Sequence, residues 1–399
     1  MTVVVDLTPV LPGGENGGAK PFALALVRDL ARLAPHTRFI VLTQAAAHDE
    51  LKWLDGPNVV RHQAVGAPGG GGGLLAWGAS VARHLPGPAR AVAGRAGYAL
   101  HRAMKRGGGG LVKSLGGDAL LCPFTAPTYA EDGIPVVCTL YDLQFRAYPE
   151  FFAPEDRMQR ERAFADCCER ATTILAISEF SRMEAVAARP DIAAKTIAVP
   201  LRIAGDAGEG DASVLSTLSL TRGRYFLYPA NFWRHKNHEA LLTALGIAVR
   251  SGLPEDFVLV CTGAPGERSA WLKEAARRFG LGDRVRFPGF VSDAQLVALR
   301  RNACAIVFPS LYEGFGLPVA EAMAAGVPVA CSDRTALAEV AGGAALTFDP
   351  RKPEEIAQAL VRLGTEARLR EDLAARGARV APSRCGTVEV AARYLERLS

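Results

Sequence analysis

The chain has 399 residues, of which 49% are hydrophobic and 22% are charged, and its formal net charge is +5. This length exceeds what one core usually serves and suits two globular domains of about 180–200 residues each. No apolar run reaches the about 18 residues of a membrane span, and the modest net charge argues against nucleic acid as a partner of the whole protein.

The chain begins with an apolar strand at Val3–Leu7, followed by a glycine-rich loop and an apolar-periodic helix at Ala19–Leu33. A strand, a glycine-rich loop and a helix can form a unit that lets a phosphate approach the backbone. The glycines match no Gly-x-Gly-x-x-Gly fingerprint, so a flexible connection is the alternative. No secretory signal is recognisable before the strand, and we therefore expect a cytoplasmic protein.

Residues 56–117 differ from the rest of the chain. They contain no Asp or Glu, they include two glycine runs, and eight Lys and Arg residues lie among apolar ones. A basic amphipathic segment of this type can bind an anionic membrane. We expect this insertion to dock the protein peripherally on the inner face of the cytoplasmic membrane. The alternatives are a solvated loop and a local nucleic-acid patch. The cations are Arg61, Arg83, Arg90, Arg95, Arg102, Lys105, Arg106 and Lys113.

Strands and helices are predicted to alternate through the rest of the first half. Polar residues follow two of the strands: Tyr141 and Asp142 after one, and the serine-containing turn Ile177–Ser181 after the other. The predicted strands are Phe39–Leu42, Ala119–Cys122, Val136–Leu140 and Thr173–Ile177, and the predicted helix is Glu155–Cys168.

A second series of the same kind follows a linker at Leu201–Gly223, which is rich in Gly, Asp, Ser and Thr. Two such series predict an α/β protein with two doubly wound parallel sheets. We place the domains at residues 1–205 and 206–385, with a last helix in 386–399. The second series has strands at Tyr225–Tyr228, Phe257–Cys261, Val285–Phe287 and Ala305–Phe308, and helices at His238–Val249, Ala294–Arg301, Leu317–Ala325 and Val388–Leu398.

The eight cysteines show no Cys-x-x-Cys spacing, and several of them lie in strand-like runs. This pattern favours reduced, buried thiols over disulfides or a zinc site. The cysteines are Cys122, Cys138, Cys167, Cys168, Cys261, Cys304, Cys331 and Cys385.

The loop after the strand Ala305–Phe308 carries the most specific motif. Glu313 and Glu321 flank a Gly-x-Gly turn, Gly314 to Gly316, that opens a helix. Glycines let a diphosphate approach backbone N–H groups, and the helix N-terminus adds about half a positive charge. Glu321 can span the vicinal hydroxyls of a ribose, and Glu313 can accept from a sugar ring. The motif predicts a nucleoside-diphospho-sugar site. The alternative is a capped surface helix with two ordinary glutamates.

The loop Tyr228–Glu239 supplies cations. A departing diphosphate develops negative charge, and no Asp-x-Asp metal motif is evident, so side-chain cations must stabilise it. Lys236, just before a helix, fits that role, and Arg234 can assist. An exposed basic helix N-terminus is the alternative.

The strings Pro-Ser-x-x-Glu-Gly-Phe-Gly-Leu-Pro and Glu-Ala-Met-Ala-x-Gly-x-Pro-Val resemble those of family 4 retaining glycosyltransferases, also called glycosyltransferase group 1. The resemblance covers roughly residues 1–55 and 118–395. It implies the GT-B fold, in which two Rossmann-like domains face each other across a cleft and a C-terminal helix crosses back. It also implies transfer of a hexose, with mannose as a candidate, from a GDP- or UDP-sugar to a glycan or lipid-linked saccharide in cell-surface polysaccharide synthesis. Neither a cofactor nor a metal is implied.

The resemblance also assigns roles to single residues. Tyr141 and Asp142 would face the donor sugar, and the family commonly has His-Asp there. A tyrosine, with a pKa near 10, shuttles protons poorly at neutral pH. A tyrosine packed in the core with Asp142 as a turn residue is the alternative. Asn231 stands where the family has the arginine of Arg-x4-Lys. The other implied donor-binding residues are Gly17, Gly18, Phe315 and Leu317, with Gly263, Phe290 and Val291 on the nucleobase side.

Two other functions remain open. A sugar-nucleotide epimerase shares the two-domain layout, and a catalytically silent nucleotide-sugar-binding homologue would explain Tyr141 and Asn231.

Overall fold

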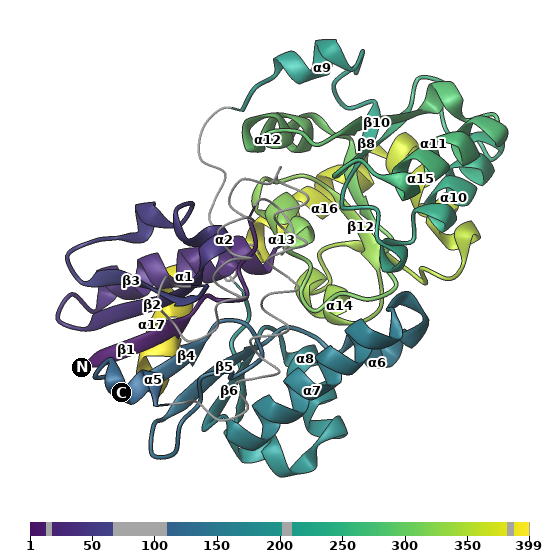
Figure 1. Cartoon of the computed structure of the whole chain (residues 1–399). Coiled ribbons are helices and arrows are strands. Elements are labelled where there is room, and N and C mark those ends of the chain that lie inside the picture. Colours follow the sequence, from purple (N-terminus) through teal and green to yellow (C-terminus); the bar gives the residue numbers. More distant parts are fainter. Residues whose placement is uncertain (13–17, 67–109, 202–209, 381–386, 399) are drawn as a thin grey trace.

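The computed structural model describes residues 1–12, 18–66, 110–201, 210–380 and 387–398 (Figure 1). Gly17, Cys385, most of the basic insertion and the expected domain boundary near residue 205 lie outside the described residues.

The first domain contains a parallel seven-stranded sheet with the order β3-β2-β1-β4-β5-β6-β7. Its strands are β1 Thr2–Asp6, β2 Arg38–Gln44, β3 Val59–Val65, β4 Ala119–Cys122, β5 Val136–Leu140, β6 Thr173–Ala176 and β7 Thr196–Ala198. Its helices are α1 Ala19–Leu33, α2 Ala45–His48, α5 Leu111–Ser114, α6 Gln144–Ala147, α7 Pro154–Arg170 and α8 Glu179–Ala188, with single turns η1 Lys52–Leu54, η2 Pro149–Phe151 and η3 Pro190–Lys195.

The second domain contains a parallel six-stranded sheet with the order β10-β9-β8-β11-β12-β13. Its strands are β8 Tyr225–Pro229, β9 Val258–Thr262, β10 Val285–Gly289, β11 Ala305–Phe308, β12 Val329–Ser332 and β13 Leu346–Phe348. The helices of this half are α9 Ser213–Thr217, α10 His238–Arg250, α11 Glu267–Arg278, α12 Asp293–Asn302, α13 Leu317–Ala324, α14 Ala336–Ala341, α15 Pro353–Thr365 and α16 Ala367–Val380, with turns η4 Arg234–Lys236 and η5 Gly282–Arg284.

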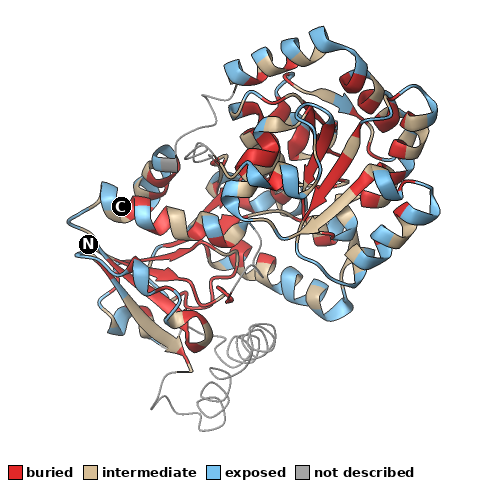
Figure 2. Ribbon diagram, turned by 90° about the horizontal axis from the view of Figure 1, so that it is seen from above, coloured by how far each residue is buried: buried red, intermediate tan, exposed pale blue. Residues whose placement is uncertain are grey.

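Both sheets are buried on their two faces, as expected for parallel strands covered by helices. In β1, Val3 and Val5 point into one core cluster of the first domain, whereas Val4 points into the other. This alternation follows from the two-residue period of a strand. Figure 2 shows the buried residues concentrated along the strands of both domains.

The last helix, α17 Thr387–Leu398, packs against α1 of the first domain, and the two lie side by side in Figure 1. Val390 and Tyr394 belong to the same core cluster as β1. The Tyr394 hydroxyl lies 2.8 Å from that of Thr139 in β5. The expected crossover helix is therefore confirmed.

Some elements differ from the expectations. Strand β3 lies inside the segment 56–117, so treating all of that segment as an insertion was wrong: residues 59–65 complete the first sheet. Helix α9 lies within the expected linker, and β7, β12 and β13 were not predicted. The seven described cysteines are free and buried, as predicted. Among the described residues, no helix is both long and apolar enough to span a membrane.

Candidate functional site

The strand order of the second sheet identifies a crevice between β8 and β11. From β8 the chain continues to β9 on one side, and from β11 it continues to β12 on the other side. In open parallel sheets, ligands bind beyond the carboxyl ends of the strands at such a switch point. The loops that follow β8 and β11 contain Lys236 and Glu313, so the two sequence motifs meet here.

Lys236 and Glu313 form an ion pair in this crevice. The Lys236 Nζ donates to Glu313 Oε1 at 2.6 Å, and both side chains are only 12% exposed. Asn237, with a left-handed φ of 60°, ends the η4 turn, and its side chain donates to the carbonyls of Pro309 and Pro350. The backbone N–H of Leu311 donates to the His235 carbonyl at 2.8 Å. The two loops are thus tied together, which fixes the position of the pair.

The two glycines of the Gly-x-Gly turn are required by packing. A Cβ atom on Gly316, which has a φ of +106°, would lie 2.5 Å from Leu337 Cδ2. A Cβ atom on Gly314 would lie 2.8 Å from the Tyr141 carbonyl oxygen and 2.9 Å from Asp142 Cβ. The Tyr141–Asp142 loop belongs to the first domain, so Gly314 lies where the two domains touch. Diphosphate access, the predicted reason for these glycines, stays a prediction.

The structure places Tyr141 in packing contacts and Asp142 in a turn, which is the alternative interpretation of this motif. The Tyr141 hydroxyl donates to the Pro123 carbonyl at 2.9 Å, and its ring packs edge-on against Phe22. Burial raises the pKa of Tyr141 well above 10, so the hydroxyl stays neutral. Asp142 Oδ1 accepts from the backbone N–H of Gln144 at 3.1 Å and forms the turn before α6. Burial also raises the pKa of Asp142.

Polar contacts join the two domains beside this site. Ser178 caps α8 by accepting from the Ser181 N–H, and its hydroxyl donates to the Gly314 carbonyl at 2.7 Å. Ser181 Oγ donates to the Tyr141 carbonyl at 2.8 Å. The serine-containing turn noted in the sequence therefore holds both Tyr141 and Gly314 in place.

Glu321 projects from α13 and pairs with Arg300 of α12. Arg300 Nη1 donates to Glu321 Oε2 at 2.5 Å, and the two side chains are 5% and 33% exposed, respectively. Sequence reasoning missed Arg300, because a contact between two helices leaves no local spacing pattern.

The other predicted site residues of the second domain lie partly in loops and partly in the core. Asn231 Oδ1 accepts from the Ala264 N–H at 3.0 Å and so holds the loop after β9. In that loop Gly263 has a φ of +154°, and a Cβ atom there would lie 2.6 Å from the Ala230 carbonyl oxygen. Phe315 is buried in the core of its domain and does not face the crevice.

The glycine-rich loop of the first domain reaches the start of α13. A Cβ atom on Gly18 would lie 3.8 Å from Leu317 Cδ1, so these two candidates from different domains are neighbours.

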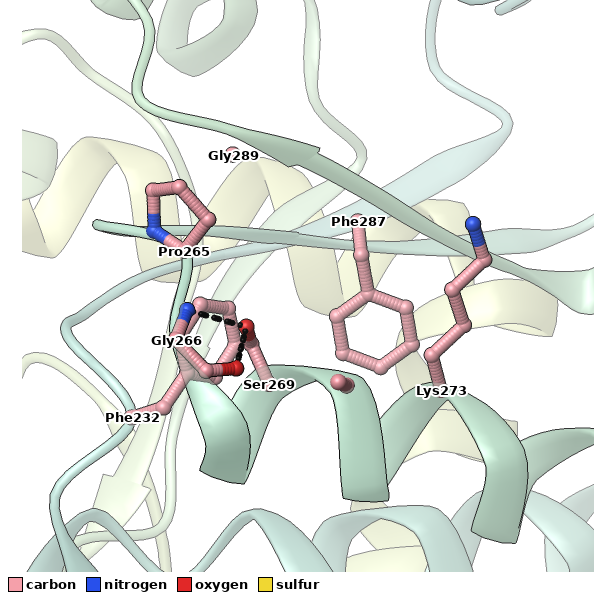
Figure 3. A pocket seen from close by; sticks show the side chains of 8 residues that line it. Phe232, Pro265, Gly266, Ser269, Lys273, Phe287 and Gly289 are labelled. Carbon is pink, nitrogen blue, oxygen red and sulfur yellow. Dashed lines mark hydrogen bonds between the residues drawn. The ribbon is translucent and has the colours of Figure 1, made fainter.

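Two surface hollows lie around the β8–α10 and β9–α11 loops. Neither of these two hollows includes Lys236 or Glu313. The first, about 430 Å³, lies beside the expected nucleobase side, where Phe232 and Phe287 face α11 (Figure 3). Phe290 is 79% exposed and Val291 is half-buried nearby. The second hollow, about 550 Å³, includes Arg234 and Trp271. The first is lined by Phe232, Pro265, Gly266, Ser269, Ala270, Lys273, Phe287 and Gly289.

Comparison with known protein families identifies the second domain. Residues 216–380, which contain Lys236, Glu313 and Glu321, match the family described as Glycosyl transferases group 1. The second domain belongs to the group 1 glycosyltransferases.

Curated relatives of this chain include bacterial mannosyltransferases. It is 32% identical over 249 residues to the O-antigen chain mannosyltransferase B of Escherichia coli, which covers 60% of this chain and 64% of that protein. It is 30% identical over 218 residues to the serotype-specific mannosyltransferase WbdA of Escherichia coli, over 52% of this chain and 26% of the relative. The chain thus spans less than two thirds of the length of these two relatives.

Solved structures share the fold along the whole chain. Anabaena HepE in complex with UDP and glucose has a TM-score of 0.70 at 19% identity, covering 100% of this chain and 99% of that one. WaaG, a glycosyltransferase involved in lipopolysaccharide biosynthesis, has a TM-score of 0.66 at 14% identity, covering 100% of both chains. Together with the two parallel sheets, these likenesses confirm the predicted GT-B fold.

Proposed function

We propose that this chain is a retaining, metal-independent glycosyltransferase that moves a hexose, with mannose as the first candidate, from a nucleoside-diphospho-sugar to a glycan or lipid-linked saccharide. The product would serve cell-surface polysaccharide synthesis. The mannosyltransferase relatives and the UDP and glucose bound by HepE support the donor class.

The observation that carries this proposal is the Lys236–Glu313 pair at the β8/β11 switch point. Lys236 is a cation paired with Glu313, the residue directly before the glycine turn that opens α13, so it can stabilise a departing diphosphate there. Glu313 is a carboxylate at the same place and can accept from the hydroxyls of the donor sugar. Glu321, one turn into α13, would accept hydrogen bonds from the ribose. Arg234 and Asn231, in the loop after β8, would also contribute to donor binding.

In a retaining transfer, the acceptor hydroxyl attacks the sugar on the same face from which the diphosphate departs. An oxygen of the leaving phosphate takes the proton of the acceptor hydroxyl. This step needs no protein base. A neutral Tyr141 whose hydroxyl already donates to a carbonyl fits such a mechanism, because it has no proton-transfer role to perform. Closure of the domains would exclude water from the reacting atoms.

The acceptor would be presented at the cytoplasmic face of the membrane, where the part of residues 56–117 that follows β3 would dock. Two of the eight cations lie in the described residues. Arg61 is mostly buried and paired with Asp55 at 2.8 Å, so it would not serve lipid binding. Lys113 is exposed on α5. Vesicle co-sedimentation tests this part: binding to anionic vesicles that survives charge reversal of Lys105, Arg106 and Lys113 would contradict it.

The central test combines nucleotide binding with transfer. We expect UDP or GDP to raise the thermal midpoint of the protein, because a ligand that binds only the folded state stabilises it. We also expect transfer of a radiolabelled hexose to a glycan or lipid extract, undiminished by EDTA. Loss of transfer in EDTA would contradict metal independence. Isomerised sugar nucleotide formed without acceptor would indicate the epimerase, and binding without transfer would indicate the silent homologue.

A further inference from the structure

Glu321, the carboxylate proposed to bind the ribose, forms an ion pair with a buried arginine. Arg300 lies in the last turn of α12, and its side chain is 5% exposed. Charged side chains are seldom buried to this extent unless they are paired. The partner is Glu321 on the neighbouring helix α13, at 2.5 Å.

The pair is asymmetric in its exposure. The Glu321 side chain is 33% exposed, more than six times the exposed fraction of Arg300. The guanidinium therefore approaches the carboxylate from the protein side, and the carboxylate remains accessible to a ligand. An ionised carboxylate has about four lone-pair positions, so a bond to Arg300 leaves capacity for ribose hydroxyls.

A buried ion pair of this type adds little net stability, because the loss of hydration offsets the attraction. Its effect is to restrict the carboxylate to one position. Hydroxyl groups of a ligand then meet a fixed carboxylate acceptor, and bonds to a charged acceptor are about twice as strong as neutral ones.

We propose that Arg300 is a positioning residue that orients Glu321 and thereby makes the site select ribonucleotides over deoxyribonucleotides. The proposal relies on the proposed donor class. It adds a residue outside the Glu-x7-Glu motif and states what that residue does for specificity.

The test measures the affinity of the full chain for UDP and GDP and for their 2′-deoxy and 3′-deoxy forms by calorimetry. We expect the wild type to prefer the ribonucleotide, because each deoxy form lacks a donor to Glu321. Arg300→Met should weaken ribonucleotide binding by about tenfold to hundredfold, the usual value of a hydrogen bond to a charged group, and leave deoxynucleotide binding nearly unchanged. The Arg300→Met variant should thus lose most of the preference for ribonucleotides over deoxyribonucleotides.

Four further variants separate the orientation of Glu321 from a general loss of stability. Arg301→Met makes the same change at the next, exposed position of α12 and should keep the ribose preference. Glu321→Gln should lose the preference, and adding Arg300→Met to it should cost little more, because both changes remove one interaction. Arg300→Lys keeps a cation and should retain part of the preference even if the methionine variant folds poorly.

The outcomes are distinguishable. If the wild type binds a ribonucleotide and Arg300→Met and Arg300→Lys keep its full preference over the deoxy forms, the assignment of Arg300 is wrong and the proposed function stands. Additive losses in the double variant would also overturn the assignment. If the wild type binds no nucleotide, both proposals fail.

Discussion

At the scale of single residues, the main feature is that Lys236 and Glu313 neutralise each other where two different parts of a donor would bind. A diphosphate would compete for the lysine, and sugar hydroxyls would compete for the glutamate. Breaking a mostly buried pair without replacement is costly, since it leaves a charge unpaired in a poorly hydrated place. Only a ligand that offers both an anion and hydroxyl groups replaces both partners at once. The pair therefore favours a complete nucleotide sugar over its fragments.

We expect Lys236→Ala to lower kcat by about a hundredfold to a thousandfold, as removal of one transition-state charge contact usually does. Glu313→Ala should also act mainly on kcat, whereas Glu321→Ala should raise KM for the donor. Steady-state kinetics with the identified donor measure these effects. Lys52→Ala, which removes an exposed lysine of η1 in the first domain, is the matched control and should leave both constants unchanged. Normal turnover in Glu313→Ala would refute the role of that residue.

A second prediction concerns Glu184 of α8, which accepts from the Tyr312 hydroxyl across the domain interface. Burial, together with the nearby Asp142, raises the pKa of Glu184 above its usual 4.5. The folded protein thus binds this proton more tightly than the unfolded chain does. The stability that it contributes is present below pH 4.5 and is lost as the pH rises through the folded-state pKa.

Glu184→Gln removes that titration and keeps the shape of the side chain. We therefore expect the variant to gain free energy of unfolding relative to the wild type as the pH is raised from 4.5 to 8. Urea unfolding at several pH values in this range measures the difference. A difference that does not change with pH would show that Glu184 does not titrate abnormally.

At the scale of elements, a helix of one domain is capped by the other domain. The Glu339 carboxylate of α14 accepts from the backbone N–H groups of Glu179 and Phe180 at 3.1 and 2.9 Å, at the start of α8. A carboxylate at this position satisfies N–H groups that have no partner within their own helix, and it also interacts favourably with the helix dipole.

Glu339→Ala should lower the free energy of unfolding by about 1 kcal/mol, the typical cost of a lost cap, and should weaken donor binding because closure depends on the same contact. Chemical unfolding and donor titration measure the two effects. Glu354→Ala, at an exposed position in the first turn of α15, is the control and should change neither. Wild-type donor affinity in the Glu339 variant would mean that this cap does not support closure.

The sequence predicts those elements whose period is strong and local. Strands β4, β5 and β11 have the bounds expected from their apolar runs, whereas β3 was missed because its sequence, Val-Val-Arg-His-Gln-Ala-Val, is polar in the middle and half-exposed at a sheet edge. The Glu313 and Glu321 motif is readable because one loop and one helix contain it. The bond from Tyr141 to Pro123 is not readable, since it depends on how separate strands meet.

At the scale of the whole molecule, the two domains touch at Gly314, whose carbonyl accepts from Ser178 and whose missing Cβ would meet the Tyr141–Asp142 loop. Any side chain at this point must push the first domain away. The relative position of the domains therefore depends on a residue that also lies in the donor loop.

Gly314→Ala should separate the domains locally and lower kcat/KM by about a hundredfold, because small displacements of reacting groups have effects of this size. Small-angle scattering with saturating nucleotide and steady-state kinetics measure the two effects. The control is Gly246→Ala within α10, where the added Cβ would meet only ordinary contacts, the nearest with Arg250 Nη1 at 3.8 Å. Unchanged scattering together with unchanged kinetics would show that the interface tolerates the methyl group.

Helix α17 has a consequence for biosynthesis. Val390, Ala391 and Tyr394 complete the core of the first domain, yet the ribosome adds them only after the entire second domain has been translated. Until then, the face of α1 that α17 covers remains an exposed apolar surface in the nascent first domain. Chaperones bind surfaces of this kind. The first domain should therefore reach its native state only once α17 has been translated, whereas the core of the second domain contains no residue of α17.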